Sequence, residues 1–322
     1  MQRGVLLLNL GGPETLRDVR PFLYNLFSDP EIIRIKSDVL RRLVAWLIAW
    51  SRNGKSQNLY RQIGGGSPLR RITEAQAAAL SARLDSAGVS SRVYVGMRCW
   101  KPSIDEAVER ILRDRITRLV LLPLFPQYSL TTTGSCLKHF EKLDRKLGLS
   151  AKMNIAVVRS WFDEPLYIES MGDLIQDGLQ HFHRGDNQEV QLLYSAHSIP
   201  VRYVKEGDPY LEQTRRSVAL INAHLNDKHP WILAFQSKVG PVRWLEPATK
   251  DVLMDLGRKG CARILTVPIS FVSDHIETLQ EIDIAYKEIA LQFGVKEFLR
   301  SESLNLHPKF IDALVSVVLK AG

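Results

Sequence analysis

Residues 190–200 read VQLLYSAHSIP, an apolar run followed by a loop of small residues that carries a histidine and ends in proline. Residues 4–13, GVLLLNLGGP, follow a similar pattern. A short apolar run bounded by turn residues is typical of a strand that is buried on both faces, as in a parallel sheet. Each stretch therefore predicts a buried strand whose carboxyl end opens into a loop.

Two further pairs of stretches make the two halves of the chain similar. They are VYVGMRCWKP and WILAFQSKVGP, and then LVLLPLFPQYS and ILTVPISFVS. Each predicts a strand followed by a loop, and segments with helical apolar spacing lie between the strands. This alternation predicts an α/β protein with two similar doubly wound, parallel-sheet domains, residues 1–150 and 151–322. Residues of about 14–72 form an insertion after the first strand of the first domain.

The predicted strands are 5–9, 92–97, 118–124, 154–158, 189–194, 231–236, 262–268 and 297–300. The clearest predicted helices are 73–87, 104–115, 166–183, 210–226, 247–259, 276–292 and 308–320. Ser103, three residues before Glu106, is a typical N-cap for the second of these helices.

Composition excludes several classes of protein. Of the 322 residues, 45% are hydrophobic and 24% charged, which excludes a disordered or collagen-like chain. The three cysteines, Cys99, Cys136 and Cys261, lie far apart and include no CxxC pair, so we expect a reducing compartment and no disulfide framework. The longest apolar run, residues 43–50, is too short to span a bilayer, and the N-terminus lacks a signal peptide pattern. We expect a cytoplasmic protein.

The positive charge is concentrated in one segment. The whole chain carries +8, and the segment from Glu31 to Arg71 contains nine basic residues against two acidic ones, which is +7. The same segment contains the run LVAWLIAW at residues 43–50. Cations beside an apolar helix with tryptophan are typical of a helix that lies on anionic lipid, although a buried helix with solvated ends is also consistent. The segment has no nucleic-acid recognition motif, so we expect no nucleic-acid partner.

Two loops carry side chains suited to proton or cation transfer. His197 directly follows a predicted strand, where it could act as a base, a metal ligand or a helix-cap partner. Glu277, Glu281 and Glu288 are spaced to share one face of the predicted helix 276–292, among bulky apolar residues. A histidine from one loop and carboxylates from the other predict a base with a proton or cation relay. No GxSxG elbow surrounds a serine, which argues against an α/β-hydrolase.

Other loops offer groups for a large ligand. Because open α/β sheets bind ligands at the carboxyl ends of their strands, we expect the site in the cleft between the two halves. Arg98 could pair with a ligand carboxylate, and Trp244 and Phe271 offer flat apolar surface for a planar ring. The hydroxyl-rich residues 127–135 could cap a helix or bind a carboxylate. Residues 63–68, IGGGSP, lack the spacing of a phosphate loop and predict a turn that approaches a ligand closely.

The ordered set of motifs resembles the ferrochelatase family from about residue 4 to 320. It comprises LNLGGPETLRDVRPFL, YRQIGGGSPL, FPQYSLTTTGS, YSAHSIP with EGDPY, FQSKVGPVRWLEP, PISFVSDHIETLQEID and ESLN. The resemblance implies two flavodoxin-like domains, a porphyrin cleft between them, Fe²⁺ as a substrate, haem as the product and no organic cofactor.

The resemblance also implies roles for individual residues. His197 and Glu277 fall at the catalytic and metal-contacting positions, and His275, Glu281 and Asp283 at a supporting acidic path. The porphyrin-contacting positions are Leu10, Ser67, Arg98, Tyr128, Trp244 and Phe271. Residues of about 30–55 correspond to a lip that contacts the membrane in some members, so we expect a cytoplasmic protein with peripheral membrane contact.

Departures from the family pattern narrow these expectations. The last cysteine is Cys261, so the C-terminal cysteine group that holds a [2Fe–2S] cluster in some members is missing, and no such cluster is expected. The sequence ends at Gly322 without the hydrophobic C-terminal extension of some photosynthetic relatives. Relatives that use coproporphyrin tend to have tyrosine where this chain has Leu10, which favours protoporphyrin IX.

Several alternatives remain open from the sequence. They are a coproporphyrin III ferrochelatase, a cobalt or nickel chelatase for a corrin precursor, and a tetrapyrrole carrier without catalysis. Two mechanisms of iron insertion are also open. In the first, His197 accepts pyrrole protons on one face of the ring, and Glu277 removes water from Fe²⁺ or moves charge on the opposite face. In the second, His197 is the first metal ligand.

Overall fold

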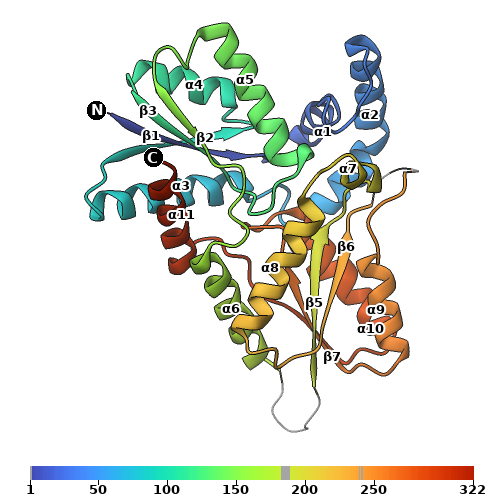
Figure 1. Ribbon diagram of the computed structural model, residues 1–322. Coiled ribbons are helices and arrows are strands. Elements are labelled where there is room, and N and C mark those ends of the chain that lie inside the picture. The colour runs from blue at the N-terminus through green and yellow to red at the C-terminus, as the bar shows by residue number, and fades with distance from the viewer. Residues whose placement is uncertain (1, 183–188, 239, 241) are drawn as a thin grey trace. The chain divides into compact units, whose positions relative to one another are not determined.

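The structure is a computed structural model that describes residues 2–182, 189–238, 240 and 242–322 (Figure 1). The chain divides into two compact units. The first unit is Met1–Trp161 with Ile311–Gly322, and the second unit is Phe162–Phe310. Each described unit is built on one four-stranded sheet whose strands are all parallel.

The two sheets have the same strand order. In the first unit the order is β2 (Ser91–Met97), β1 (Arg3–Asn9), β3 (Arg118–Pro123) and β4 (Asn154–Val157). In the second unit it is β6 (Trp231–Gln236), β5 (Val190–His197), β7 (Arg263–Pro268) and β8 (Glu297–Arg300). This order, with the first strand inside and the second at the edge, is that of flavodoxin-like sheets. The predicted fold class, two similar doubly wound α/β domains, is confirmed.

The units divide the chain differently from the expected boundary at residue 150. β4 pairs with β3 in register Arg118↔Asn154, so the first unit continues beyond that position. Most of α11 (Pro308–Ala321) also belongs to the first unit, where Asp312 forms an ion pair of 3.3 Å with Arg83. Strand pairing decided the first assignment and docking of a helix far along the chain decided the second, and local sequence carries no signal for either.

Helices of the first unit lie between and after its strands. Besides α11 they are η1 (Leu16–Asp18), α1 (Val19–Phe27), α2 (Asp38–Gln62), α3 (Leu69–Ser86), α4 (Ile104–Arg113), η2 (Leu130–Gly134) and α5 (Ser135–Leu147). Leu6 and Leu8 of β1 pack in one buried cluster with residues of α4 and α5. Ser103 and Glu106 form a capping box at the start of α4, which confirms the predicted N-cap.

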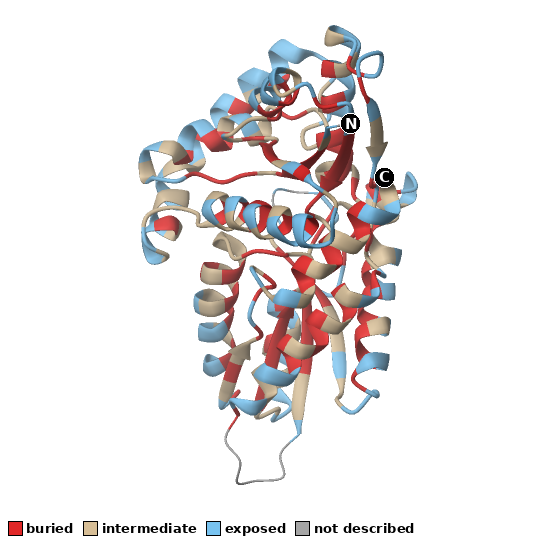
Figure 2. Ribbon diagram, turned by 90° about the vertical axis from the view of Figure 1, so that its left-hand side faces the viewer, coloured by how far each residue is buried: buried red, intermediate tan, exposed pale blue. Residues whose placement is uncertain are grey.

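The second unit is built in a similar way. Its helices are α6 (Pro165–Gln180), α7 (Val201–Lys205), α8 (Tyr210–His224), α9 (Thr249–Arg258), η3 (Glu277–Tyr286) and α10 (Lys287–Gln292). Leu193 of β5 and Ala234 of β6 pack in one cluster with residues of α9, η3 and α10. Figure 2 shows buried residues along the strands and on the inner sides of the helices. His183, the last residue of the predicted helix 166–183, lies outside the described residues.

The predicted insertion folds into η1, α1, α2, the connection to α3 and the first turn of α3. The side of α2 that packs inward carries the buried residues Arg41, Ala45, Ala49 and Tyr60. Its apolar side chains point to solvent instead, with exposed fractions of 46–80%, at Val39, Leu40, Leu43, Trp46, Leu47 and Trp50. The alternative of a buried core helix for residues 43–50 is therefore wrong. None of the helices in the described ranges combines the length and apolarity needed to cross a membrane.

Candidate active site

The alternation of β5 directs His197 toward η3. Successive side chains of a strand point to opposite faces, so Leu193, Ser195 and His197 share one face. Leu193 packs with Ile282 and Tyr286 of η3, which identifies that face. The strand ends at His197, so its imidazole lies where the sheet stops and the loops begin. The predicted position of His197 at the carboxyl end of a strand is confirmed.

His197 and Glu277 are in direct contact. Nδ1 of His197 lies 2.9 Å from Oε2 of Glu277, and Nε2 of His275 lies 3.9 Å from the same oxygen. The side chains of His197 and Glu277 keep 37% and 24% of their surface exposed. The contact corrects the expectation that these two groups act on opposite faces of a ring, because groups joined by a hydrogen bond must approach a substrate from the same side.

Burial and neighbouring charges shift the pKa values of the two histidines in opposite directions. Burial lowers the pKa of His197, but the charge of Glu277 and its hydrogen bond outweigh burial and raise that pKa above 6.5. Burial alone would raise the pKa of Glu277, but the neighbouring His197 and His275 lower it well below its usual value. For His275, burial dominates and lowers the pKa. Of the two histidines, His197 therefore has the higher affinity for a proton.

The backbone and the ring of His197 are held from several sides. Its N–H donates to Oγ of Ser270 at 3.2 Å, and the hydroxyl of Tyr210 donates to its carbonyl oxygen at 2.8 Å. The ring of Phe271 lies edge-on to His197 and to His275, with centroids 6.3 and 4.5 Å apart. Sequence reasoning missed Ser270 and Tyr210 as supporting residues, although Tyr210 ends the EGDPY motif.

Glu281 lies behind Glu277 and receives four hydrogen bonds. The donors are Nε2 of Gln236 at 3.1 Å, the N–H of Ser237 at 3.1 Å, Oγ of Ser237 at 2.5 Å and the hydroxyl of Tyr286 at 2.8 Å. Burial and the nearby charge of Glu277 raise the pKa of Glu281, against the effect of these donors. The supporting position expected for Glu281 fits this arrangement, while Gln236, Ser237 and Tyr286 were not foreseen from the sequence.

Asp283 and Glu288, two acids expected near Glu277 and Glu281, lie elsewhere. Asp283 forms a bidentate ion pair with Arg300, at 2.7 and 2.9 Å, instead of facing Glu277. Glu288 is exposed on α10, so the expectation that three glutamates share one face is wrong. The reason is that residues 277–286 form a π-helix, whose wider turn changes the phase of the residues that follow it.

In the first unit, Arg98 already binds a carboxylate of the protein. Its guanidinium lies 3.1 Å from Oδ2 of the fully buried Asp29, and its Nε donates to Oγ of Ser135 at 2.9 Å. Ser135 also donates to Asp29. These three residues line part of a cavity of about 260 Å³. The prediction that Arg98 pairs with a ligand carboxylate therefore competes with an internal ion pair that the sequence did not reveal.

The loops at Ser67 and Tyr128 pack tightly within the first unit. The N–H of Ser67 donates to the carbonyl of Pro13 at 2.7 Å, and a Cβ on Gly12 would lie 2.8 Å from the Ser67 side chain. The carbonyl of Leu10 accepts from the N–H of Cys99 at 2.9 Å. A Cβ on Gly66 would lie 2.0 Å from the carbonyl oxygen of Glu14, so the close approach that needs glycine is between two loops of the protein. In the loop that contains Tyr128, Oγ of Ser129 accepts a hydrogen bond from the N–H of Thr131. This loop therefore caps a helix, which is one of the two roles predicted for residues 127–135.

Trp244 is tied to the loop that follows His197. It forms an isolated antiparallel bridge with Pro200, and the N–H of Val201 donates to the carbonyl of Arg243 at 2.9 Å. Its indole Nε1 is buried without a hydrogen-bond partner in the described part of the chain. Of the six porphyrin-contacting candidates, Trp244 and Phe271 lie in the second unit and the other four in the first. Their meeting around one ligand stays a prediction.

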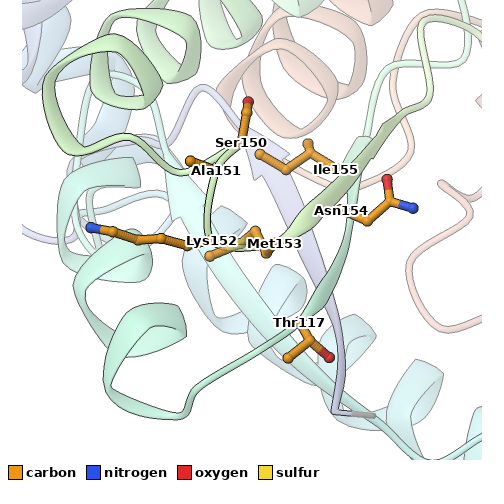
Figure 3. A pocket seen from close by; sticks show the side chains of 7 residues that line it. All are labelled: Thr117, Ser150, Ala151, Lys152, Met153, Asn154 and Ile155. Carbon is orange, nitrogen blue, oxygen red and sulfur yellow. The ribbon is translucent and has the colours of Figure 1, made fainter.

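A larger hollow lies away from these loops. Figure 3 shows it beside the amino ends of β3 and β4, with a volume of about 600 Å³ and with Thr117, Ser150 and Asn154 among its lining side chains. Ligands of open α/β sheets bind at the carboxyl ends, and none of the predicted site residues lines this hollow. Among the residues that the structure describes, no group of three or more His, Cys, Asp or Glu side chains is arranged to hold a metal ion.

Solved structures share the fold of this chain. SirB from Bacillus subtilis with Fe³⁺ matches with a TM-score of 0.57 and 13% identity, over 100% of this chain and 96% of SirB. CbiX, described as the terminal enzyme for biosynthesis of sirohaem in denitrifying bacteria, matches with a TM-score of 0.53 and 16% identity, over 99% and 100%. At such low identity these matches support the two-domain α/β architecture alone.

Sequence comparisons identify the family. The ferrochelatase family profile matches residues 2–321. A ferrochelatase from Gloeothece citriformis is 51% identical over 319 residues, which are 99% of this chain and 82% of the relative. A ferrochelatase from Synechocystis sp. is 50% identical over 317 residues, which are 98% of this chain and 81% of the relative. The chain therefore belongs to the ferrochelatase family.

Proposed function

We propose that this chain inserts Fe²⁺ into protoporphyrin IX and produces protohaem, without an organic cofactor or an iron–sulfur cluster. Membership of the family assigns the reaction class, insertion of iron into a porphyrin during haem synthesis, which makes the chain a lyase. The observation that carries the proposal is the contact of 2.9 Å between His197 and Glu277 at the carboxyl end of β5. Leu10 supports protoporphyrin as the ring.

The chemistry of metal insertion fits this pair. The ring must lose two pyrrole protons while Fe²⁺ loses water, so the site must accept protons and offer a ligand to the metal. His197, whose pKa is raised by Glu277, accepts one proton from a pyrrole nitrogen, and water released by Fe²⁺ accepts the other. Glu277, a carboxylate of lowered pKa, offers an oxygen to Fe²⁺ and balances the charge of the imidazolium. In the second version of this scheme, His197 ligates Fe²⁺ first and Glu277 receives the proton.

Parallel assays with two porphyrins test the substrate. Fe²⁺ insertion under anaerobic conditions, followed by porphyrin absorbance, should give a higher kcat/KM with protoporphyrin IX than with coproporphyrin III. The opposite preference would assign the chain to the coproporphyrin branch. Binding of protoporphyrin without insertion of any divalent metal would instead favour the carrier alternative and overturn the proposed activity.

The proposal includes a cytoplasmic protein that contacts an anionic membrane surface through α2. Exposed apolar side chains on one helix, such as Leu43 and Trp50, favour burial in a lipid interface. Basic residues accompany them, since the guanidinium of Arg20 lies 5.8 Å from the ring of Trp46. The excess of cations in this segment favours anionic lipid over a neutral surface.

Vesicle pelleting tests this contact. The protein should sediment with vesicles that contain phosphatidylglycerol, less with pure phosphatidylcholine, and less again in high salt. The double variant Leu43→Ser, Trp50→Ser should lose most of this binding. Leu319→Ser is the matched control, because it removes an apolar side chain of 43% exposure from α11 instead. Equal pelleting of both variants, or no pelleting of the parent protein, would argue against the membrane contact.

A further inference from the structure

Tyr286 belongs to a shell of neutral donors around Glu281. Among the described residues, the partners of the Glu281 carboxylate are Gln236, Ser237 and Tyr286, and no Arg or Lys is paired with it. Buried carboxylates are usually paired with a cation, because a neutral shell compensates the lost hydration less well. A buried carboxylate that is held in place without a paired cation is suited to attract a cation that enters the site.

The π-helix makes the contact with Tyr286 geometrically accessible. Glu281 and Tyr286 are five residues apart, and an α-helix, with about 100° per residue, would turn them roughly 140° away from each other. The i→i+5 hydrogen bonds of a π-helix bring residues of this spacing to nearly the same face. The hydroxyl of Tyr286 reaches Oε1 of Glu281 at 2.8 Å as a result. The π-helix therefore makes possible the hydrogen bond by which Tyr286 joins the shell of donors around Glu281.

Gln236 connects this shell to the metal-contacting candidate. Its Nε2 donates to Oε2 of Glu281 at 3.1 Å and to the backbone carbonyl of Glu277 at 3.3 Å. The orientation of its amide is fixed by Oγ of Ser195, which donates to Oε1 at 2.6 Å. The position of Glu281 and the start of the π-helix at Glu277 are thus linked through one buried side chain.

Ser237 contributes two donors from a strained backbone. Its φ of +64° lies in the left-handed region, which non-glycine residues rarely adopt. In this conformation both its N–H and its Oγ reach the Glu281 carboxylate, at 3.1 and 2.5 Å. Strain of this kind persists where surrounding contacts compensate for it, and here the contacts are those with Glu281.

We propose that Tyr286 and Ser237 are positioning residues for iron insertion, which hold the Glu281 carboxylate in one orientation behind Glu277 so that it attracts the incoming Fe²⁺. This inference rests on the proposed function. Tyr286 touches neither His197 nor Glu277 in any described contact, so it acts through Glu281. Its contribution concerns the metal and not the ring, and this separates it from residues that bind the porphyrin.

Tyr286→Phe tests the proposal, because it removes the hydroxyl and keeps the packing of the ring. We expect about a tenfold lower kcat/KM for Fe²⁺ and an unchanged KM for the porphyrin, as for the loss of one hydrogen bond to a charged group. The matched control is Tyr194→Phe, which removes a buried hydroxyl bonded to Asn222 on the other face of the same sheet. The control should lower thermal stability by a similar amount and leave the metal kinetics unchanged.

A double-mutant cycle with Glu281→Gln tests the route of the effect. If Tyr286 acts through Glu281, adding Tyr286→Phe to Glu281→Gln should change kcat/KM for Fe²⁺ by less than twofold. Equal effects of Tyr286→Phe in both backgrounds, or equal losses in Tyr286→Phe and Tyr194→Phe, would overturn the inference. A parent protein that inserts no metal would contradict the proposed function itself, so the two failures are distinguishable.

Ser237→Gly separates the two donors of Ser237. Glycine adopts the observed φ without strain and keeps the N–H, so only the hydroxyl bond is lost. We expect a smaller loss in kcat/KM for Fe²⁺ than in Ser237→Ala, which loses the same hydroxyl but retains the backbone strain. Parent-like metal kinetics in both variants would remove Ser237 from the proposal.

Discussion

Two pairs of acids on the segment 274–283 have opposite surroundings. Asp274 and Asp283 both lie against the guanidinium of Arg300, at 3.2 and 2.7 Å, and Asp274 also accepts from Asn305 at 2.8 Å. In the described part of the chain, Glu277 and Glu281 have no Arg or Lys partner and face histidines and neutral donors instead. One pair is bound to an arginine within the fold, and the other is not.

The difference teaches which acids can do chemistry. A carboxylate bound to a guanidinium is less available to a metal or a proton, so we expect Asp274 and Asp283 to stabilise the segment. The glutamates are held by a histidine and by neutral donors without an arginine, which suits transfer of cations and protons. The following variants test this division.

The largest effect is expected from His197→Ala. Loss of the proton acceptor should lower kcat for Fe²⁺ insertion about a thousandfold, as for general bases elsewhere, with little loss of stability. Porphyrin absorbance under anaerobic conditions measures the rate. His181→Ala, on the exposed histidine that directly follows α6, is the control and should behave like the parent. Near-normal turnover in His197→Ala would contradict both versions of the mechanism.

Glu277→Gln should lower the rate about a hundredfold, because it keeps the shape of the side chain and removes its charge. The charge of Glu277 raises the pKa of His197 against the opposing effect of burial, so its removal should lower that pKa. Titration of the His197 imidazole by NMR measures the shift. An unchanged pKa would mean that the contact of 2.9 Å carries no electrostatic coupling.

Arg300→Leu should act on stability. It leaves Asp274 partly buried without its cation, which should cost about 3 kcal/mol in the free energy of unfolding. Urea unfolding monitored by circular dichroism measures this loss. The folded protein should keep the parent KM for Fe²⁺, since Arg300 faces the other pair of acids. A changed KM for Fe²⁺ in the folded variant would mean that the two pairs of acids act together in metal binding.

The same ion pair predicts a dependence of stability on pH. Burial raises the pKa of Asp274, but Arg300 and the donors outweigh burial and hold it below 3.8. A carboxylate with a lowered folded pKa contributes stability above its unfolded pKa and loses it as the pH falls through the folded value. The stability advantage of the parent over Asp274→Asn should therefore be full at pH 6 and shrink below about pH 4. An advantage that stays constant down to pH 3 would contradict this origin.

The smallest effect is expected from Glu288→Gln. Its side chain is exposed beyond the π-helix, so the change should alter stability by less than about 0.5 kcal/mol and leave the rate unchanged. Steady-state assays and thermal melts measure both quantities. A loss of activity comparable with that of Glu277→Gln would mean that Glu288 acts together with Glu277 and Glu281 although it lies beyond η3.

Much of the fold could be predicted from the sequence because the relevant signals are local. The strands at 231–236 and 297–300 have the predicted ends, since apolar runs between turn residues mark buried parallel strands. The assignment of β4 to the first sheet was not foreseen, because pairing between distant segments leaves no local trace.

The site was predicted in part. His197 and Glu277 could be selected because each follows a buried strand, and the structure brings them into contact. The roles of Arg300, Asp29 and Tyr286 could not be predicted, since a charged or hydroxyl side chain has the same local pattern whether it is solvated or paired. The exposed side of α2 was left undecided for the same reason.

The sequence by itself determined the two parallel-sheet domains, the family and the positions of the histidine and the acids, because periodicity and motif order are properties of the chain. Only the tertiary structure decided which acids are bound to an arginine and which are left available. That outcome depends on the phase of a π-helix and on an arginine at the end of β8. The packing of these elements, and not their composition, separates Glu277 and Glu281 from Asp274 and Asp283.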